Sequence, residues 1–521
     1  MLGKIRQLFG KNEPAVSRRP GPTGRGQVSR IYEAARYDRH TEGWFGDYGV
    51  SQWDITGQLQ IVRNRSREMV KNDPHLQRFI WQRRNNIIGA NGFNLTAKPF
   101  DQFGARKAYD KSAARMIQDA WIDWSTTPEY CDAHGRKTFA EILWACDRDW
   151  VREGEAILEV RRGSASGPYA VQLLRRRPDS LAIRFLAELS NGNKVYNGVE
   201  VDASGRVAAY WFYRAMLPTG IWGGDMDRVP AEYVCHLYNE DYEGQHRGFP
   251  IIACVLRATK ILHQYIDAEL IKARKEAYQA GAYTVDAAML ANADPAQLGE
   301  PSVEDCRTQM QQNIEPGEDR IVAPGWKYEM PSATAPNPNF APFKQEMLRI
   351  VASGIGAAYH NLASDFASIN WSAGRLAENE QREGWLCDQQ MYINHVLRPV
   401  FRGHWCEMLL LSGKTPLPFS KLAKFQRCDT WSGKRWFPAD PVNEIPMLET
   451  MVRRGWTTDS AIAASFGFGT FAENVEQTKR DDEDAVGTDI ANRNKTQITA
   501  SMEQAKAQQQ QTAAKVVPDE K

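Results

Sequence analysis

The sequence predicts an α+β protein that is mostly helical. Long segments place apolar residues at every third or fourth position, which is typical of amphipathic helices, and they dominate the chain after residue 250. Alternating apolar and polar runs, typical of strands, lie between about residues 155 and 214. Because 521 residues exceed the size at which a single core stops growing, we expect two to four folding units.

Composition favours a folded, soluble chain made in a cytoplasm. Apolar residues make up 42% of the sequence and charged residues 25%, so most of the chain can bury a core. The longest apolar runs fall far short of the roughly 20 residues that span a bilayer, and the start has no stretch suited to a secretory signal. The eight cysteines are spread singly, which indicates reduced thiols rather than a disulfide framework or a zinc module.

Charge is distributed unevenly along the chain. Residues 1–100 hold 17 Lys or Arg against 8 Asp or Glu, whereas the whole chain carries a net charge of +1. A tight, general DNA binder is usually basic overall, because each neutralised phosphate releases counterions. The sequence therefore does not indicate a chain that grips DNA tightly.

Both termini have compositions typical of unfolded segments. Residues 1–30 are rich in Arg, Pro and Gly and predict a flexible basic arm. Residues 481–521 open with the acidic run DDED and continue as a Gln- and Ala-rich stretch. This stretch predicts a disordered tail or a marginal lone helix.

Residues 31–250 have a mixed α/β pattern. The strand-like runs are EAILEVRR, YAVQLLRR and NGVEVDASGRVAAYWFYR, in which DASG supplies a hairpin turn. Helical patterns occupy 63–92, 106–125 and 139–154. The first is basic and suggests nucleic acid contact, but its arginines point to several sides and alternate with apolar residues. An amphipathic helix that pairs with acidic neighbours is therefore favoured.

A long helical pattern follows at 251–282. Its apolar residues form one narrow stripe, and the opposite face carries charged residues. Such a helix is roughly 48 Å long at 1.5 Å per residue, so the narrow stripe suits packing against one or two neighbours rather than burial in a globule. Its Ala-rich end, AYQAGAY, lets backbones approach closely.

A second helix is predicted to begin near Asn339. The Asn339 side chain is expected to cap it, Pro342 lies in its first turn, and Gly354 and Gly356 let it end. Residues 283–337 hold Pro, Gly and short strand-like runs. We therefore expect a helical hairpin with a compact tip.

The stretch NLASDFASIN at 361–370 is polar, and its apolar residues look too scattered to pack, so it predicts a loop. A third helix is expected from about 373 to 411. Pro399 lacks a backbone donor and crowds the carbonyl four residues earlier, which predicts a kink near Ile393 to His395. Residues 413–480 predict a smaller region with a turn and two short helices.

The motif search gives no catalytic, nucleotide or metal site. SGKT at 412–415 resembles the end of a P-loop, but Met408 stands where the required first glycine belongs. The histidines are scattered, and His404 and Cys406 lie about 200° apart around one helix, so they cannot share a metal. No HExxH, GxSxG or Ser/His/Asp pattern occurs. We expect no enzyme and no cofactor.

Four blocks of sequence, in this order, carry a family resemblance. They are RNRSREMVKNDPHLQRFIWQRRNNIIGANG; VPAEYVCHLYNEDYEGQHRGFPIIACVLRATKILHQYIDAELIKARKEA; EPGEDRIVAPGWKYEMPSATAPNPNFAPFKQEMLRIVASGIG with SDFASINWSAGRLAENE; and ADPVNEIPMLETMVRRGWTTDSAIAASFG. In this order they resemble the lambda-type family of portal proteins of tailed bacteriophages, over roughly residues 36–480. The chain departs from the family where an aromatic-Ser-Ser run often precedes an Arg, because it reads NWSAGR.

The resemblance implies a portal fold with wing, stem, clip and crown regions around a central channel. It implies a ring, typically of twelve subunits, at one capsid vertex. The regions map as follows: wing 31–250, stem helices 251–282 and 338–358, clip 283–337, tunnel loop 359–372, a long kinked wing and crown helix 373–412, and crown 413–480.

Two groups of residues are expected to face the channel. DNA must pass quickly in both directions, and strong phosphate grips would act as friction, so a near-neutral chain with a polar loop at the bore is physically sensible. The tunnel loop supplies polar side chains and the second stem helix supplies two cations. The residues are Asn361, Ser364, Asp365, Ser368, Asn370, Lys344 and Arg349.

The resemblance also implies partners and a location. With no Walker motif, force must come from a separate ATPase, the large terminase, which docks at the clip and is replaced there by head-completion or tail connector proteins. The major capsid and scaffolding proteins are further partners, and double-stranded DNA passes without sequence specificity. We expect the protein at the portal vertex of the virion, and in the host cytoplasm during assembly, with no membrane.

Two other functions stay open at this point. One is a different structural virion protein, such as a capsid or tail component. The other is a hydrolase that uses the carboxylates at 147–155 or 239–243.

Overall fold

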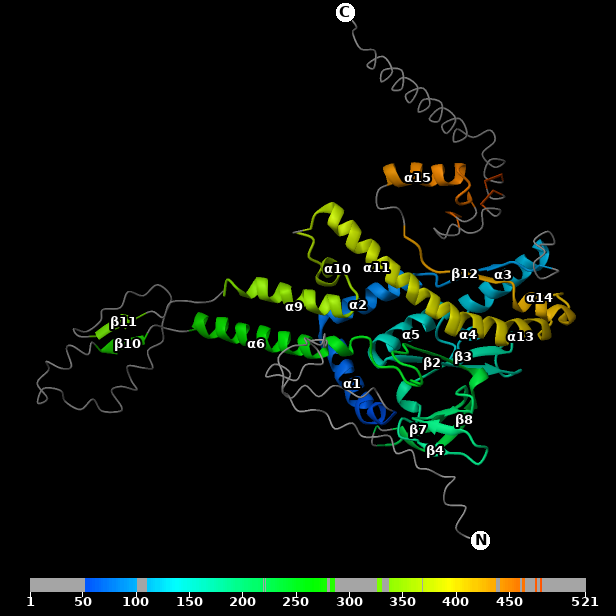
Figure 1. Ribbon diagram of the computed structural model, residues 1–521, viewed down its shortest axis with the longest axis horizontal. Helices are drawn as coiled ribbons and strands as arrows, with labels where there is room; N and C mark the ends of the chain where they lie inside the picture. Colours follow the sequence, from blue (N-terminus) through cyan, green and yellow to red (C-terminus); the bar gives the residue numbers. More distant parts are fainter. Residues whose placement is uncertain are drawn as a thin grey trace, which may run out of the picture. The chain divides into compact units, whose positions relative to one another are not determined.

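The computed structural model describes most of the chain from residue 52 onward (Figure 1). The described residues are 52–100, 110–218, 220, 222–278, 282–285, 326–329, 337–367, 369–436, 441–459, 462–463, 474–475 and 478–479. The predicted basic arm, the predicted tail and most of the predicted hairpin tip lie outside them. Within the described residues the protein is α+β and mostly helical, as predicted.

A three-stranded antiparallel sheet, in the order β3-β2-β9, follows helix α5 (Phe139–Glu153). A capping box formed by Thr138 and Glu141 starts this helix, and Gly154 ends it with a φ of +88°. A Cβ at Gly154 would collide with the backbone of Phe249, so both the dihedral angle and the space demand glycine. The strands are β2 (Glu155–Arg162), β3 (Val171–Arg176) and β9 (Val234–Tyr238).

A second sheet is an antiparallel meander of five strands, in chain order β4-β5-β6-β7-β8. The predicted DASG turn joins β6 to β7. There Asp202 accepts hydrogen bonds from the backbone N–H groups of Ser204 and Arg206, at 2.8 and 2.9 Å. The strands are β4 (Ala187–Glu188), β5 (Lys194–Tyr196), β6 (Val199–Val201), β7 (Val207–Met216) and β8 (Trp222–Pro230).

The single basic helix predicted at 63–92 is wrong in detail, because the structure divides it. Helix α1 (Gln52–Asn72) starts earlier than predicted, and α2 (Pro74–Arg83) follows after a break at Asp73. The Asp73 carboxylate accepts from the backbone N–H of Leu76 at 2.7 Å, and Pro74 occupies the first helical position. The sequence NDPH at 72–75 predicts this break, because an Asp followed by a Pro is typical of a helix start.

The remaining elements before β9 are a π-helical turn, one strand and two α-helices, which follow α2 in that order, and two short 3-10 turns. Of the helix predicted at 106–125 the structure describes residues from 110 onward, where α3 ends one residue later than predicted. The elements are the π-helical turn η2 (Arg84–Ile88), β1 (Asn94–Ala97), α3 (Lys111–Thr126), α4 (Pro128–Cys131), η3 (Pro178–Ser180) and η4 (Ala231–Tyr233).

The third predicted helix is continuous but changes its hydrogen bonding twice. Where a kink was predicted before Pro399, the chain forms a π-helical turn over Ile393–Leu397, in which each N–H reaches one residue further back than in an α-helix. This change in hydrogen bonding lets the helix continue although Pro399 has no backbone N–H to donate. The segments are α11 (Trp371–Tyr392), η6 (Ile393–Leu397), α12 (Arg398–Val400), η7 (Phe401–Trp405) and α13 (Cys406–Leu411).

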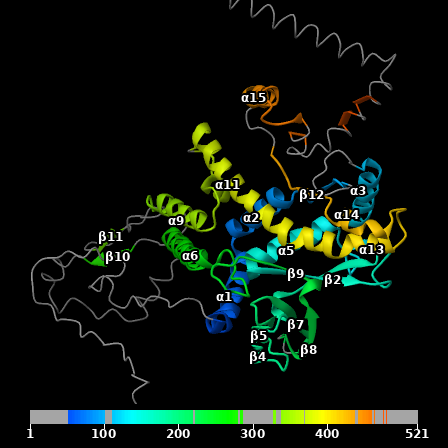
Figure 2. The same cartoon turned by 45° about the vertical axis from the view of Figure 1, so that its right-hand side comes forward.

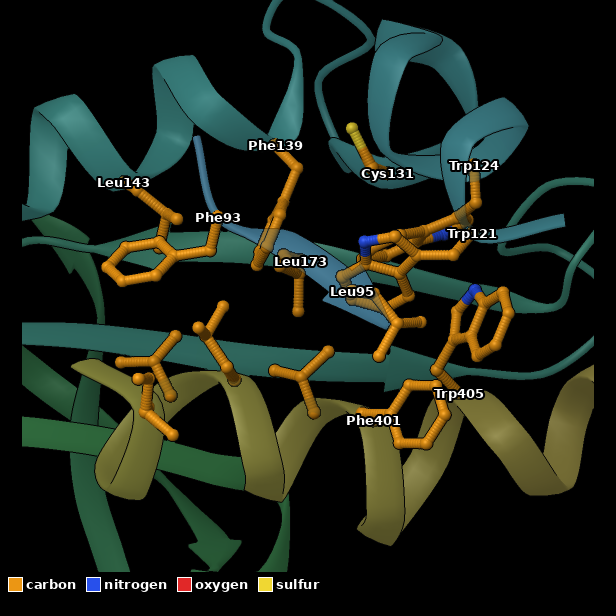
Figure 3. Close-up of a cluster of buried hydrophobic side chains, with 14 of the residues drawn as sticks. Phe93, Leu95, Trp121, Trp124, Cys131, Phe139, Leu143, Leu173, Phe401 and Trp405 are labelled. Carbon is orange, nitrogen blue, oxygen red and sulfur yellow. The ribbon is translucent and has the colours of Figure 1, made fainter. Parts of the chain in front are cut away.

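The largest hydrophobic core joins residues 87–173 and 235–237 to residues 385–436 (Figure 3). Trp121 from α3 lies with its ring centroid 4.9 Å from Trp124, 5.0 Å from Trp405 and 5.1 Å from Trp431. Strand β12 (Asp429–Ser432) pairs antiparallel with β1, so that Leu95 opposes Trp431. The first part of the segment predicted as crown therefore packs within this core.

Helices α6 (Leu256–Tyr278) and α9 (Phe340–Gly354) lie side by side in both views, as the predicted hairpin requires (Figures 1 and 2). Tyr265 packs on Phe340 and Phe343, with ring centroids at 5.9 and 4.7 Å. The first helix was predicted to reach residue 282, which is wrong: α6 ends at Tyr278, and β10 (Ala282–Val285) pairs antiparallel with β11 (Trp326–Glu329).

The predicted cap of α9 is also wrong. Asn339 occupies the cap position, but its side chain makes no capping hydrogen bond, and Asn337 Oδ1 instead accepts from the Asn339 backbone N–H at 3.0 Å. The remaining described elements are η5 (Ala253–Val255), α10 (Tyr359–Ala363), η8 (Phe419–Lys421), α14 (Leu422–Gln426) and α15 (Pro441–Arg453).

Candidate functional site

The segment predicted as a polar tunnel loop begins with a helix. Residues Tyr359–Ala363 form α10, and Leu362 is fully buried in a cluster with Leu76, Phe79 and Ile355. The prediction that the apolar residues of this stretch are too scattered to pack is therefore wrong. One apolar residue sufficed because α2 and α9 supply the other walls of the cluster.

Asn361 ties α10 to two other helices. Its backbone carbonyl accepts hydrogen bonds from the side chains of Arg78 and Gln82, both on α2. Its side-chain Nδ2 donates to Gln381 Oε1 on α11 at 2.8 Å. The half-buried Asn361 side chain is thus engaged within the chain, and it anchors the start of the segment.

The following residues are more exposed. Ser364 is exposed and ends α10 in the left-handed conformation, with φ at +56°. Asp365 Oδ2 accepts from the Tyr359 hydroxyl at 2.9 Å. Exposed Asn370 caps α11 by accepting from the Ser372 backbone N–H at 3.3 Å. Ser368 lies outside the described residues.

The two predicted phosphate contacts differ in their surroundings. Arg349 on α9 forms an ion pair with Glu346 at 2.5 Å, and its guanidinium lies 5.4 Å from the centroid of the Tyr359 ring. Through Tyr359 it is therefore linked to Asp365. Lys344 is half-buried five residues earlier, which places it about 140° around the helix from Arg349. The structure thus connects Arg349 to Asp365 only through Tyr359, and it places Lys344 on another face of the helix.

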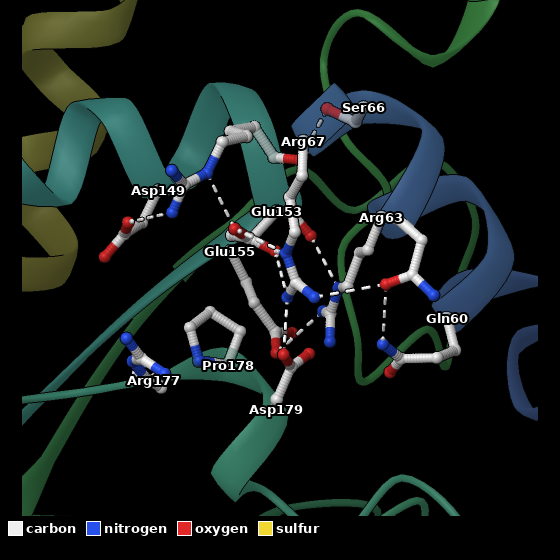
Figure 4. A network of polar contacts seen from close by, with 12 residues as sticks. Gln60, Arg63, Ser66, Arg67, Asp149, Glu153, Glu155, Arg177, Pro178 and Asp179 are labelled. Atoms are coloured by element: carbon white, nitrogen blue, oxygen red, sulfur yellow. Dashed lines mark hydrogen bonds and ion pairs between the residues drawn. The ribbon is translucent and has the colours of Figure 1, made fainter. Parts of the chain in front are cut away.

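A buried charge cluster joins α1, β2 and the segment before η5 (Figure 4 shows its α1 side). Arg63, Glu155 and Arg247 are all fully buried, and Glu155 Oε1 lies 2.9 Å from Arg63 Nη2 and 2.6 Å from Arg247 Nη2. His236 Nε2 lies 3.1 Å from Glu155 Oε2. Burial alone would raise the pKa of Glu155, but Arg247 and Arg63 outweigh it and hold that pKa well below its usual range.

The neighbouring carboxylates of α5 are paired with arginines as well. Their partners come from α1, α2 and β3, so this stretch fixes these elements to one another. The pairs are Asp147 with Arg83, Asp149 with Arg175, and Glu153 with Arg67.

This pairing weighs against the hydrolase alternative at 147–155. A general acid or base must reach a substrate, whereas these carboxylates reach arginines. The prediction that the basic segment pairs with acidic neighbours is confirmed by Arg63, Arg67 and Arg83, but the sequence did not show that these neighbours are the carboxylates of 147–155. A signal was present, since a Glu heads a strongly apolar strand in EAILEV.

Neither a metal site nor a membrane span emerges from the described part of the chain. There, no group of three or more His, Cys, Asp or Glu side chains is arranged to hold a metal ion. No helix among the same residues is both long and apolar enough to cross a bilayer.

Fold and site thus define a mixed α+β protein whose charged groups act as structural ties. The chain belongs to the lambda family of phage portal proteins, because the sequence model described as "Phage portal protein, lambda family" matches residues 37–389. The family membership that the sequence resemblance predicted is thereby confirmed.

Relatives in curated collections agree with this membership. The "Probable portal protein" of Halomonas phage phiHAP-1 is 26% identical over 486 residues, covering 90% of this chain and 89% of the relative. "Portal protein B" of Escherichia phage lambda is 20% identical over 512 residues, covering 89% and 93%. Among solved structures, a chain of "Neck of native GTA particle computed with C12 symmetry" is 13% identical with a TM-score of 0.43, covering 77% and 93%. That structural likeness is too low to carry an argument.

Proposed function

We propose that the chain assembles into a ring, typically of twelve copies, at one vertex of a phage capsid. Double-stranded DNA passes through the ring during packaging and again during ejection. The observation that carries this proposal is the uncovered apolar surface of the α6–α9 hairpin. Leu270 and Ile271 on α6 are 62% and 64% exposed, and Ile350 on α9 is 58% exposed.

These side chains need partners that one copy does not supply. Burying a leucine or isoleucine side chain is worth about 1.5–3 kcal/mol, so leaving several on one hairpin is unfavourable for an isolated subunit. A head-to-tail ring supplies the missing surface from the next copy, because each copy presents two different faces to its two neighbours. The hairpin is then the stem, and the tip at 283–337 is the clip.

The tunnel loop has an anchored start and an exposed remainder. Asn361 holds α10 to α2 and α11, whereas Ser364, Asp365 and Asn370 are less enclosed. We assign these three, together with Ser368, to the channel wall. Arg349 has a nearby carboxylate at Glu346, which moderates its attraction for passing phosphates and keeps friction low.

The partners follow from the family. The large terminase docks at the clip during packaging and supplies the force, and head-completion or tail connector proteins take its place afterwards. Scaffolding and major capsid proteins surround the wing and crown in the assembling virion.

Electron microscopy of the purified chain tests the ring. We expect hollow particles with one narrow end and a mass near twelve times that of one chain. The double variant L270E/I271E is expected to shift the protein to single copies, whereas Q264E, which adds a charge at an exposed polar position of the same helix, leaves the rings intact. A wild-type chain that remains a single compact copy would overturn the proposal.

A further inference from the structure

A groove of about 900 Å³ lies among α1, α2, α5, β8 and the residues after β3. Its walls carry eight Lys or Arg side chains and four Asp or Glu side chains, so the groove has a net positive charge. Trp81, which is 56% exposed, forms part of the wall. This feature is separate from the hairpin and from the tunnel loop.

Four of these cations are not used by the fold. Arg67, Arg152 and Arg175 are paired with carboxylates of the groove itself. The guanidinium of Arg84 lies over the Trp144 ring, 5.3 Å from its centroid. Within the described residues the remaining four make no ion pair: Lys71, Lys137, Arg148 and Arg177 line the groove and are half-buried or exposed.

Arg148 shows that the groove favours an anion. Partial burial lowers the pKa of Arg148; Asp149 raises it in part, and the nearby Arg152 and Arg175 lower it further. A carboxylate placed beside Arg148 would relieve this repulsion. The same change would add charge-assisted hydrogen bonds to a planar guanidinium.

The chain carries a matching anion, tethered close to the groove. The densest acidic run in the sequence is Asp481–Asp484. The described core ends at Trp436, whose Nε1 donates to Asn86 Oδ1 at 2.7 Å, two residues from the groove residue Arg84. The 44 residues between Trp436 and Asp481, which include helix α15, give ample length to return, and attachment to the same chain raises the effective concentration of the run at the groove.

We propose that this groove binds the acidic run Asp481–Asp484 of the same chain. In extended form four residues span about 13 Å, which suits a groove of this volume. A single nucleic-acid strand carries the same sign of charge, and the third outcome of the test below separates it from the acidic run. The charges on the two sides are complementary, because four unpaired cations face four carboxylates.

Zero-length carbodiimide cross-linking of the full chain tests the contact, since it joins only amines and carboxylates that touch. Peptide mapping is expected to show Lys71 or Lys137 linked to residues 481–484, with no such link at Lys421, an exposed lysine outside the groove. The variant R148Q/R177Q should lower the yield at least fivefold, whereas R257Q/R427Q, at two exposed arginines elsewhere, should not change it.

A second measurement uses a fluorescent peptide with the sequence of residues 476–490. It should bind the full-length D481N/D482N/E483Q/D484N variant at least tenfold more tightly than the wild type, because the groove is then vacant. Binding should weaken as salt is raised, and R148Q/R177Q on the same background should abolish it.

Three outcomes overturn the proposal. The first is an absence of cross-links between the groove lysines and the run. The second is a set of cross-links, in a mixture of isotopically labelled and unlabelled copies, that join different chains only, which would make the groove a subunit contact. The third is binding of a 12-nucleotide single strand, but not the peptide, to the neutralised variant, which would assign the groove to nucleic acid. None of these depends on ring formation.

Discussion

Arg63 of α1 and Glu155, the first residue of β2, are both fully buried, and their side chains approach to 2.9 Å. Arg247 and His236 complete the surroundings of the same carboxylate. Three elements distant in sequence therefore meet at one negative charge. Removing the charge of Glu155 would leave the arginines buried without a counter-charge, which destabilises the folded state. In the intact cluster the carboxylate and the cations neutralise one another.

We expect Glu155→Gln to destabilise the chain by about 3–5 kcal/mol, because it leaves Arg63 and Arg247 buried without a counter-charge. Urea unfolding followed by circular dichroism measures the change. Glu188→Gln is the matched control, since Glu188 is exposed and its ion pair with Lys194 contributes at most about 1 kcal/mol. A loss below about 1 kcal/mol for Glu155→Gln would show that the cluster is not a structural tie.

Stability should fall as the pH drops below about 6.5, in part because of His236. Burial lowers the pKa of His236, although Glu155 opposes this effect, so the folded chain binds the proton less readily than the unfolded chain does. The unfolded state then gains protons first as pH falls, and the unfolding free energy decreases by up to about 1.4 kcal/mol per pH unit for this one group.

The variant His236→Gln tests this dependence. Its unfolding free energy should vary less between pH 7.5 and 5.5 than that of the wild type, whereas exposed His134→Gln should keep the wild-type slope. Glu155 acts at lower pH: its pKa is depressed in the fold, so its stabilisation is complete above about 4.5 and is lost as the pH falls through the folded value. Equal slopes for His236→Gln and the wild type would contradict the assignment.

Leu362→Ala should cost about 2–5 kcal/mol, because it opens a cavity between α10, α2 and α9. Leu411→Ala removes a half-exposed side chain at the end of α13 and should cost far less. The comparison, made by thermal or urea unfolding, decides whether α10 is a fixed element. If the two variants unfold alike, the packing of Leu362 does not hold the segment in place.

Two helical glycines should respond oppositely to alanine. A Cβ at Gly354 would lie 2.5 Å from Val255 Cγ1, so Gly354→Ala should destabilise the chain by about 1–3 kcal/mol. Gly384 in α11 has open space around it, and Gly384→Ala should stabilise the chain by up to about 1 kcal/mol through its helix propensity. Unfolding midpoints measured on both variants should therefore move in opposite directions.

Local patterns in the sequence predicted the elements whose signals are local. The 3.6-residue periodicity located α5, α6, α9 and α11, and the DASG turn located the β6–β7 hairpin. Pro399 marked the π-helical turn before it. These features depend on residues within one or two turns of each other.

Features that depend on distant partners were missed. Leu362 packs because α2 lies over it, and nothing in its own ten residues shows that helix. Glu155 pairs with arginines 92 positions on either side, at 63 and 247, so the acidic partner of the basic helix could not be identified from local spacing. The Asn339 cap lacks one of its two usual donors, because Pro342 at the third helical position has no backbone N–H.

The pairing of β1 with β12 has a consequence for synthesis. Leu95 leaves the ribosome 336 residues before its partner Trp431 does. At about 5–20 residues per second, the aromatic core around Trp121 stays open for roughly 15–70 s of translation. A nascent chain in this interval presents tryptophans to solvent, so chaperones that cover apolar surface should hold it until the last strand of that sheet emerges.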